Sequence, residues 1–237
     1  MTSPTLPDKY AQLYDETWRK NFAHGTESCG DFALSMEFIE RTGLLRPEHH
    51  VLEIGCALGR LTAALHDKGF IRIIGTDIAP AVIELGRQRH PQVDLRSMDA
   101  SRLAFDDASF DVCLSFDLVE HLPDVTAHFR EVRRLLKPNG HYLFQTPNIL
   151  SNALYETLRH RNLKWRAFHP SLQTAGSLRR KLTQAGFRDI SFTKMSPVSE
   201  VKIKQVSPAL RRLFTAIPWT RLPLPLQTNF YVTARCG

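Results

Sequence analysis

The residues whose types and spacing point most directly to chemistry lie between Glu53 and Asp99. An apolar run, Val51–Ile54, leads into a turn with glycines at 55 and 59, and a helical pattern starts directly after it. Gly55 and Gly59 let the backbone approach a ligand without a side-chain clash. The glycine spacing fits neither a dinucleotide fingerprint nor a P-loop. The turn therefore predicts a ligand-binding loop of another kind.

Three acidic residues accompany this turn. Glu53 lies just before it, Asp77 closes the next apolar run, and Asp99 follows the third. A carboxylate at the position of Asp77 can accept two hydrogen bonds from a ribose diol. Because the carboxyl ends of successive parallel strands converge on one crevice, the three acids predict a ligand site at that edge of a sheet.

The hydrophobic pattern predicts the strands and helices that would position these residues. Strands are expected at Val51–Ile54, Ile71–Thr76, Val93–Arg96, Val112–Phe116, Tyr142–Gln145, Ile190–Lys194 and Asn229–Ala234. Helical patterns occupy Leu58–Lys68, Pro80–Arg89, Val125–Leu136 and Ala175–Ala185. Such alternation is typical of crossover units with helices on both faces of a sheet. The expected fold is α/β with a mainly parallel, seven-stranded sheet.

Two segments stand outside this alternation. Residues 1–45 are predicted to form an N-terminal helical cap or lid, and residues 46–237 the ligand-binding domain. Within that domain, residues 196–226 form a proline-containing insertion in which basic residues alternate with apolar ones. This mixture suits a lid over a hydrophobic acceptor or peripheral contact with an anionic membrane, and we favour the substrate lid.

The composition is that of a globular protein, with 43% hydrophobic and 23% charged residues. The formal charge of +7 favours an anionic partner. Most basic residues after Arg130 occur at helical spacing among apolar ones, which is typical of solvated helix faces and makes nucleic acid the weaker choice. The four cysteines form no CxxC pair, and the N-terminus shows no signal-peptide pattern. A cytoplasmic location is expected.

Further motifs extend the pattern. They are Glu53-Ile-Gly-Cys-Ala-Leu-Gly59, Met98-Asp-Ala100, Phe110-Asp-Val-Cys-Leu-Ser-Phe116, Leu118-Val-Glu-His-Leu-Pro-Asp124, Leu135-Leu-Lys-Pro-Asn-Gly140 and Tyr142-Leu-Phe-Gln-Thr-Pro-Asn148. Together with Asp77 they resemble the class I S-adenosylmethionine-dependent methyltransferases, in the small-molecule branch that includes ubiquinone-type O-methyltransferases. The resemblance covers Val51 to Gly186. It implies a Rossmann-like fold, S-adenosylmethionine as cofactor and S-adenosylhomocysteine as product.

The resemblance also implies which residues bind the cofactor. The loop from Gly55 to Gly59 would hold its methionine part, Asp77 its ribose, and Asp99 the polar edge of its adenine. The full implied set is Glu53, Gly55, Cys56, Ala57, Gly59, Asp77, Ile78, Asp99, Ala100, Ser115 and Phe116. The family usually has glycine where this chain has Ala57, so a slightly tighter turn with retained binding is expected.

His121 is the candidate catalytic base, because a hydroxyl acceptor must lose a proton and the reference pKa of histidine, about 6.5, suits that transfer. The alternative is that His121 packs under the cofactor or caps a helix. Asp117, Glu120 and His121 together are similar to the divalent-metal site of some quinone O-methyltransferases, a less favoured interpretation. Tyr10, Tyr14 and His169 are candidate substrate contacts, with loop or core roles as the alternative.

The favoured function is methyl transfer to a small-molecule hydroxyl, hydrophobic or anionic in character. The alternatives are N-methylation of a small molecule, nucleic-acid methylation, and a non-catalytic module that only binds the cofactor. Phe116-Asp-Leu-Val119 differs from the Asn/Asp-Pro-Pro-aromatic sequence of enzymes that methylate base amines, which argues against that subgroup. The sequence leaves the oligomeric state open.

Overall fold

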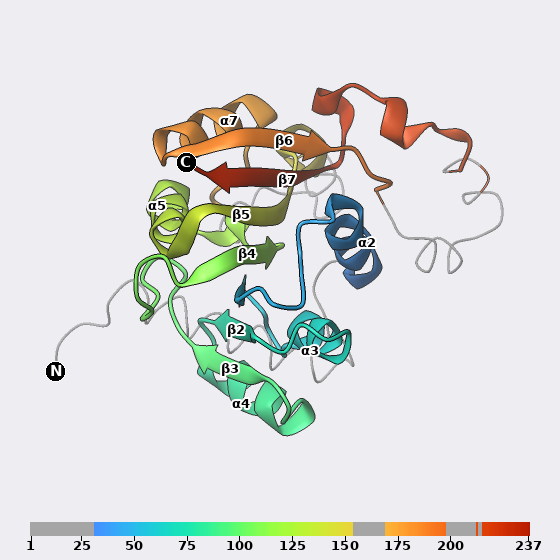
Figure 1. Ribbon diagram of the computed structural model, residues 1–237. Helices are drawn as coiled ribbons and strands as arrows, with labels where there is room; N and C mark the ends of the chain where they lie inside the picture. The colour runs from blue at the N-terminus through green and yellow to red at the C-terminus, as the bar shows by residue number, and fades with distance from the viewer. Residues whose placement is uncertain (1–30, 154–168, 198–211, 213–214) are drawn as a thin grey trace, which may run out of the picture.

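The computed structural model describes residues 31–153, 169–197, 212 and 215–237. Its centre is a seven-stranded sheet with the order β3-β2-β1-β4-β5-β7-β6 (Figure 1). The strands are β1 (Val51–Ile54), β2 (Ile73–Asp77), β3 (Asp94–Ser97), β4 (Phe110–Phe116), β5 (Leu136–Pro147), β6 (Phe187–Thr193) and β7 (Asn229–Cys236). The expected mainly parallel, seven-stranded α/β fold is confirmed.

The direction of the strands brings the predicted ligand residues to one edge. β1 to β5 are parallel to one another, whereas β7 runs antiparallel to both β5 and β6. In register, Glu53 lies beside Gly75 on one side and Leu114 on the other. The first five strands therefore end at a common edge, where Gly55, Asp77 and the loop after β3 follow.

Helices cover both faces of the sheet. Residues of α2 (Phe32–Thr42) and α3 (Arg60–Asp67) pack on one face. Residues of α5 (Val125–Leu135) and α7 (Ala175–Gln184) pack on the other. The helix α4 (Pro80–Arg89) contacts β2 and β3 at the sheet's end (Figure 1).

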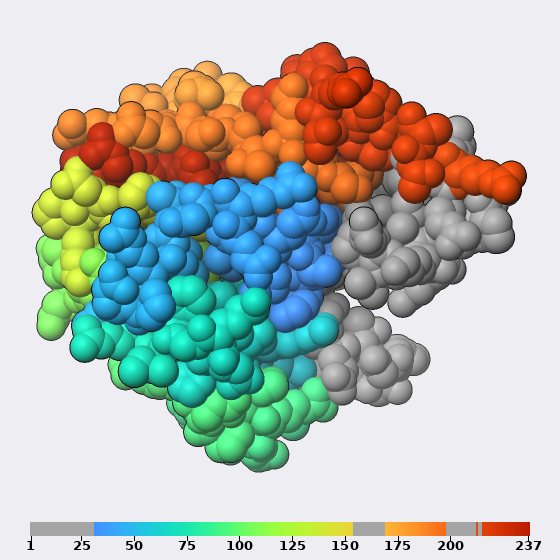
Figure 2. All heavy atoms as spheres, turned by 45° about the vertical axis from the view of Figure 1, so that its right-hand side comes forward, coloured from blue at the N-terminus to red at the C-terminus, as the bar shows by residue number. Residues whose placement is uncertain are grey.

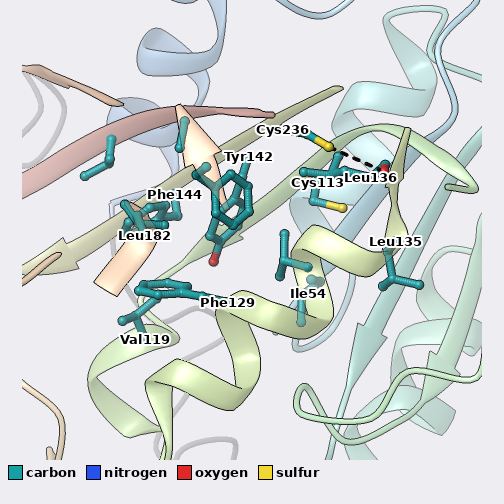
Figure 3. Close-up of a cluster of buried hydrophobic side chains, with 14 of the residues drawn as sticks. Ile54, Cys113, Val119, Phe129, Leu135, Leu136, Tyr142, Phe144, Leu182 and Cys236 are labelled. Atoms are coloured by element: carbon teal, nitrogen blue, oxygen red, sulfur yellow. Dashed lines mark hydrogen bonds between the residues drawn. The ribbon is translucent and has the colours of Figure 1, made fainter. Parts of the chain in front are cut away.

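The larger core cluster lies between the sheet and α5 (Figure 3). Phe129 of α5 packs near Tyr142 and Phe144, whose rings stack with centroids 4.7 Å apart. The buried stripe of α5 consists of Val125, His128, Phe129, Val132 and Leu135. His128 is thus a polar residue on an otherwise apolar helix face, where an unsatisfied imidazole would be costly.

The helix α2 packs as part of the core. Phe38 is fully buried, and its ring contacts those of Phe116 and Tyr231. In Figure 2 the blue residues that include α2 lie across the middle of the visible face of the molecule. The teal residues that follow in the sequence lie below them, and the orange and red C-terminal residues lie above. The rest of the predicted cap, residues 1–30 with Tyr10 and Tyr14, lies outside the described residues. The division into a cap and a domain at residue 46 stays a prediction.

Strand β5 is longer than the sequence pattern predicts. The strand β5 begins at Leu136, six residues before the predicted start, because Phe110 pairs with Leu136 before the chain bulges. The segment Pro138-Asn139-Gly140, typical of a turn, lies within this strand, and Asn139 has a φ of 64°.

The insertion at 196–226 is described at residues 196–197, 212 and 215–226, with short helices η3 (Trp219–Arg221) and η4 (Leu224–Leu226). No helix in the described ranges is long and apolar enough to cross a bilayer.

Candidate cofactor and acceptor site

The loop after β1 has an unusual backbone. Gly55, Ala57 and Gly59 all have positive φ, at 79°, 48° and 76°. A Cβ on Gly59 would lie 2.7 Å from the Leu95 side chain, and one on Gly55 would lie 3.1 Å from Leu118. The positive φ therefore favours glycine at both positions, and a side chain there would also have to displace a leucine. Ala57 has the small strain of a left-handed alanine, about 1 kcal/mol, so its cost arises from backbone conformation rather than from a tighter turn.

Asp77 holds this loop to the next one. Its Oδ2 accepts a hydrogen bond from the Ala57 N–H at 2.9 Å, and its Oδ1 accepts from the Ala79 N–H at 3.0 Å. An ionised carboxylate has about four acceptor positions, so these two bonds are compatible with further donors such as a ribose diol. The carboxylate predicted to bind ribose therefore also fixes the loop predicted to bind the methionine part.

Glu53 lies beneath the loop as a buried acid. Its side chain is 5% exposed and accepts a hydrogen bond from the Thr62 hydroxyl at the start of α3. Burial, with a smaller contribution from the nearby Asp77, raises the pKa of Glu53 to about 7. An added cationic group, such as the amine of an amino acid, would stabilise its ionised form. Thr62 was missed by the sequence analysis, since a threonine inside a helix carries no special signal.

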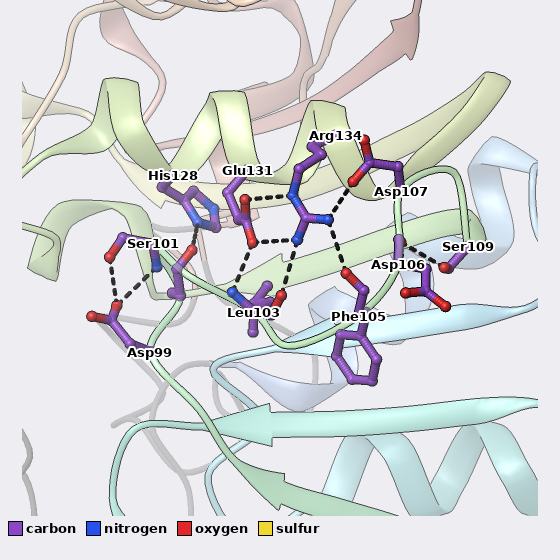
Figure 4. Close-up of polar contacts among 11 residues, drawn as sticks. Asp99, Ser101, Leu103, Phe105, Asp106, Asp107, Ser109, His128, Glu131 and Arg134 are labelled. Atoms are coloured by element: carbon purple, nitrogen blue, oxygen red, sulfur yellow. Dashed lines mark hydrogen bonds and ion pairs between the residues drawn. The ribbon is translucent and has the colours of Figure 1, made fainter.

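The predicted adenine-edge residues lie on the segment between β3 and β4. Asp99 Oδ1 accepts hydrogen bonds from the Ser101 N–H at 2.8 Å and the Ser101 hydroxyl at 2.9 Å. The Ala100 carbonyl bonds to His128 Nδ1 at 2.9 Å (Figure 4). Ile78, half-buried after β2, accepts a bond from the Ser97 hydroxyl through its carbonyl. These contacts place Asp99, Ala100 and Ile78 at the same edge of the sheet as Asp77.

The side chains of three other predicted cofactor residues, Cys56, Ser115 and Phe116, are wholly or partly buried in the protein. The Cys56 thiol is buried among apolar side chains, and burial raises its pKa far above the usual range. Ser115 is fully buried and its hydroxyl bonds to the Tyr142 hydroxyl at 2.5 Å. Phe116 packs edge-on against Phe38. For Cys56 and Ser115, backbone atoms rather than side chains are the groups that a ligand could contact.

His121 and His169, the candidate base and a candidate substrate contact, come together beyond β4. The rings of His121, in η1 (Val119–His121), and His169 lie 4.9 Å apart between centroids. Glu120 Oε1 lies 3.9 Å from His121 Nε2, and Glu120 Oε2 accepts a 2.9 Å bond from the Thr146 hydroxyl of β5. The structure thus joins His121 and His169, forty-eight positions apart in the sequence, and adds Thr146, which no sequence pattern indicated.

Burial shifts the pKa values of Glu120 and His169. Glu120 is 2% exposed, and desolvation raises its pKa to about 7. Desolvation, with a smaller contribution from His121, lowers the pKa of His169 to about 4, so His169 is neutral near pH 7. Within the described ranges, no group of three His, Cys, Asp or Glu side chains is arranged to hold a metal ion. Asp117, Glu120 and His121 accordingly do not form such a group in this structure.

Comparison with known proteins finds methyltransferases that are similar to the central part of this chain. A family model described as "Methyltransferase domain" matches residues 52–144. A "Probable S-adenosylmethionine-dependent methyltransferase" of Mycolicibacterium smegmatis is 34% identical over 137 residues, 58% of this chain and 51% of that protein. The ubiquinone biosynthesis O-methyltransferase of Coxiella burnetii is 30% identical over 48% of this chain and 49% of its own length. Phosphoethanolamine N-methyltransferase 1 of Arabidopsis thaliana is 28% identical over 73% and 35%. The chain thus spans about half or less of the length of these relatives.

Solved structures agree with this assignment at the level of fold. A SAM-dependent methyltransferase from Thermotoga maritima superposes with a TM-score of 0.62 at 18% identity, covering 96% of this chain and 98% of that one. The phosphoethanolamine N-methyltransferase 2 of Haemonchus contortus, solved with S-adenosyl-L-methionine, gives 0.58 at 18% identity over 86% and 51%. The predicted Rossmann-like fold is confirmed. The Mycolicibacterium relative and both solved structures are described with S-adenosylmethionine, the cofactor predicted here.

Proposed function

We propose, from the premise that residues 52–144 form a methyltransferase domain of the S-adenosylmethionine-dependent type, that this chain methylates a hydroxyl group of a small molecule. The observation that carries the cofactor part of the proposal is that Asp77 bonds to both Ala57 and Ala79 at the edge where the parallel strands end. A carboxylate held between two loops in this way is oriented for a ribose before any ligand arrives. The neighbouring pair of His121 and His169 supports the hydroxyl acceptor.

The residues present fit S-adenosylmethionine. The loop from Gly55 to Gly59 would hold the methionine part, and the buried Glu53 favours a nearby cation. Asp77 would hold the ribose, and Asp99 with Ala100 the adenine edge. When bound, S-adenosylmethionine supplies an electrophilic methyl group on a sulfonium sulfur.

The acceptor would bind beyond the end of β4, next to His121 in η1. His121 would take the proton of the acceptor hydroxyl, so that the oxygen can accept the methyl group that bound S-adenosylmethionine would supply. Glu120, 3.9 Å from His121, would stabilise the resulting imidazolium. The neutral His169, whose ring faces that of His121, would contact the acceptor. A general base is more useful for a hydroxyl than for an amine, which supports oxygen as the acceptor atom.

N-methylation is the second candidate. It is favoured by the Arabidopsis phosphoethanolamine relative, whose match extends over 73% of this chain.

We also propose a cytoplasmic location, which is supported by the free, buried thiols of Cys56, Cys113 and Cys236.

The test has two stages. Purified protein is titrated calorimetrically with S-adenosylhomocysteine, and micromolar affinity is expected. Labelled methyl transfer is then measured with panels of phenols, aliphatic alcohols and amines, with and without a chelator. Binding with turnover of hydroxyl compounds supports the proposal. Turnover of amines alone would assign N-methylation, and an absence of binding would overturn the proposed function.

A further inference from the structure

A chain of hydrogen bonds runs through the core beneath the predicted adenine-edge segment. His128 Nδ1 lies 2.9 Å from the Ala100 carbonyl, and His128 Nε2 lies 2.9 Å from the Tyr142 hydroxyl. That hydroxyl lies 2.5 Å from Ser115 Oγ. His128, Tyr142 and Ser115 are all fully buried, so these groups depend on one another for hydrogen bonds.

The direction of each bond follows from its chemistry. A carbonyl can only accept, so His128 Nδ1 carries a proton and donates to the Ala100 oxygen. Burial lowers the pKa of His128 to about 4, so the ring is neutral and Nε2 accepts. The Tyr142 hydroxyl must then donate to Nε2, and the Ser115 hydroxyl donates to the Tyr142 oxygen. One tautomer of His128 therefore satisfies the chain.

The same helix face fastens the rest of the segment. His128, Glu131 and Arg134 are spaced three residues apart on α5 (Figure 4). Glu131 Oε1 accepts from the Leu103 N–H at 2.7 Å, and Arg134 donates to the Leu103 carbonyl at 2.9 Å and the Phe105 carbonyl at 2.8 Å. Glu131 and Arg134 thus hold the part nearer β4, whereas His128 holds the part with Asp99 and Ala100.

We propose that His128 is a positioning residue for adenine recognition, because its bond to the Ala100 carbonyl fixes the Ala100–Ser101 peptide, whose N–H donates to the Asp99 carboxylate. The Ala100 N–H lies on the adjoining peptide. This inference rests on the proposed function. Asp99 is set on one side by its bonds to Ser101, and the Ala100 peptide is set on the other by His128. Asp99 offers an acceptor and the Ala100 N–H a donor. This pair is complementary to the amino group and the N1 acceptor of adenine.

His128 bonds to Ala100 through Nδ1 and to Tyr142 through Nε2, and three variants separate the effects of these two bonds. In His128→Asn the amide nitrogen takes the place of Nδ1 and retains the bond to Ala100. In His128→Gln the amide takes the place of Nε2 and reaches Tyr142 instead. Tyr142→Phe removes the hydroxyl and leaves the His128–Ala100 bond. All three should lower the midpoint of thermal unfolding, since each leaves buried groups without partners.

The readout is base discrimination. S-adenosylhomocysteine is compared with S-inosylhomocysteine, whose ring carries a carbonyl in place of the amino group and a proton on N1. We expect the wild type, His128→Asn and Tyr142→Phe to prefer the adenosyl ligand by at least about 10-fold, and His128→Gln by no more than about 3-fold. Equal discrimination by all four proteins, or a loss that follows thermal stability, would overturn the positioning role.

A measurement on the unaltered protein covers the case in which a variant does not fold. A long-range proton–nitrogen spectrum at pH 7 should show His128 protonated at Nδ1 with and without S-adenosylhomocysteine, and an Nε2-protonated ring would overturn the inference. Failure of the wild type to bind S-adenosylhomocysteine overturns the proposed function itself. Binding without the expected discrimination pattern overturns the role of His128 alone.

Discussion

The carboxylate of Asp77 and the N–H of Ala57, twenty positions apart, are joined by a hydrogen bond of 2.9 Å. Because Asp77 also bonds to the Ala79 N–H, one side chain connects the loop after β1 to the first turn of α4. Replacing Asp77 therefore affects the shape of the site as well as its contact with a ribose. Asparagine keeps one acceptor oxygen, but its amide nitrogen would face the N–H of Ala57 or Ala79 and lose that bond.

We expect Asp77→Asn to weaken S-adenosylhomocysteine binding by about 1–3 kcal/mol, because charge-assisted hydrogen bonds to the ribose become neutral ones and one of the two loop bonds is lost. Isothermal titration calorimetry measures the change. Asp94→Asn is the control, since Asp94 is an exposed acid of β3 that pairs with Arg96, and its affinity should equal that of the wild type. Equal affinity of Asp77→Asn and the wild type would refute the ribose assignment.

Ala57→Gly should leave the protein at least as stable as the wild type. Glycine adopts the left-handed φ of 48° without strain, which offsets the roughly 0.5–1 kcal/mol that glycine loses through chain entropy. Ala81→Gly is the matched control, because Ala81 is exposed in α4 and the entropy loss there is not offset. Urea unfolding compares the two, and a larger loss of stability at position 57 than at position 81 would contradict this account.

Glu120→Gln should change how the free energy of unfolding depends on pH. The folded-state pKa of Glu120, about 7, is above the usual 4.5, so folding favours the protonated acid. Its contribution to stability is complete below pH 4.5 and is lost as the pH rises to about 7. The wild type should therefore lose stability relative to Glu120→Gln across this range.

A second variant gives the opposite sign. The Arg134 guanidinium lowers the pKa of Glu131, so this carboxylate contributes stability at higher pH that is lost as the pH falls. The advantage of the wild type over Glu131→Gln should therefore shrink as the pH falls below about 4.5 and stay constant above it. Urea denaturation of all three proteins from about pH 3.5 to pH 8 provides the comparison, and parallel curves for Glu120→Gln and the wild type would show that Glu120 is not perturbed.

His121→Gln should lower the rate of methyl transfer to a hydroxyl acceptor by about 10²–10⁴-fold, the usual contribution of a general base. Binding of S-adenosylhomocysteine should be unchanged, since His121 is assigned to the acceptor. His90→Gln, at the end of α4, is the control and should retain full activity. A loss of less than 10-fold in His121→Gln would remove His121 from the base role, while a parallel loss of cofactor affinity would favour packing beneath the cofactor.

The sequence by itself determined which segments form strands and helices, and where the cofactor loop lies in the chain. Apolar runs separated by helical periods predict strands such as β1 and helices such as α4, because burial on both sides of a parallel strand leaves a continuous apolar run. Gly55 and Gly59 were predictable for a similar reason, as close backbone approach requires residues without Cβ. These are local properties, and the chain carries them residue by residue.

Only the tertiary structure decided which polar groups meet across the chain. Asp77 and Ala57, His121 and His169, and His128 and Ala100 are each brought together by strand order and helix packing, which no local pattern encodes. His128 carried one signal, a polar residue in the apolar stripe of α5, but its partners came from β5 and from the segment after β3. The pKa values of Glu53 and Glu120 also depend on burial, and burial is decided only when the sheet and its helices pack.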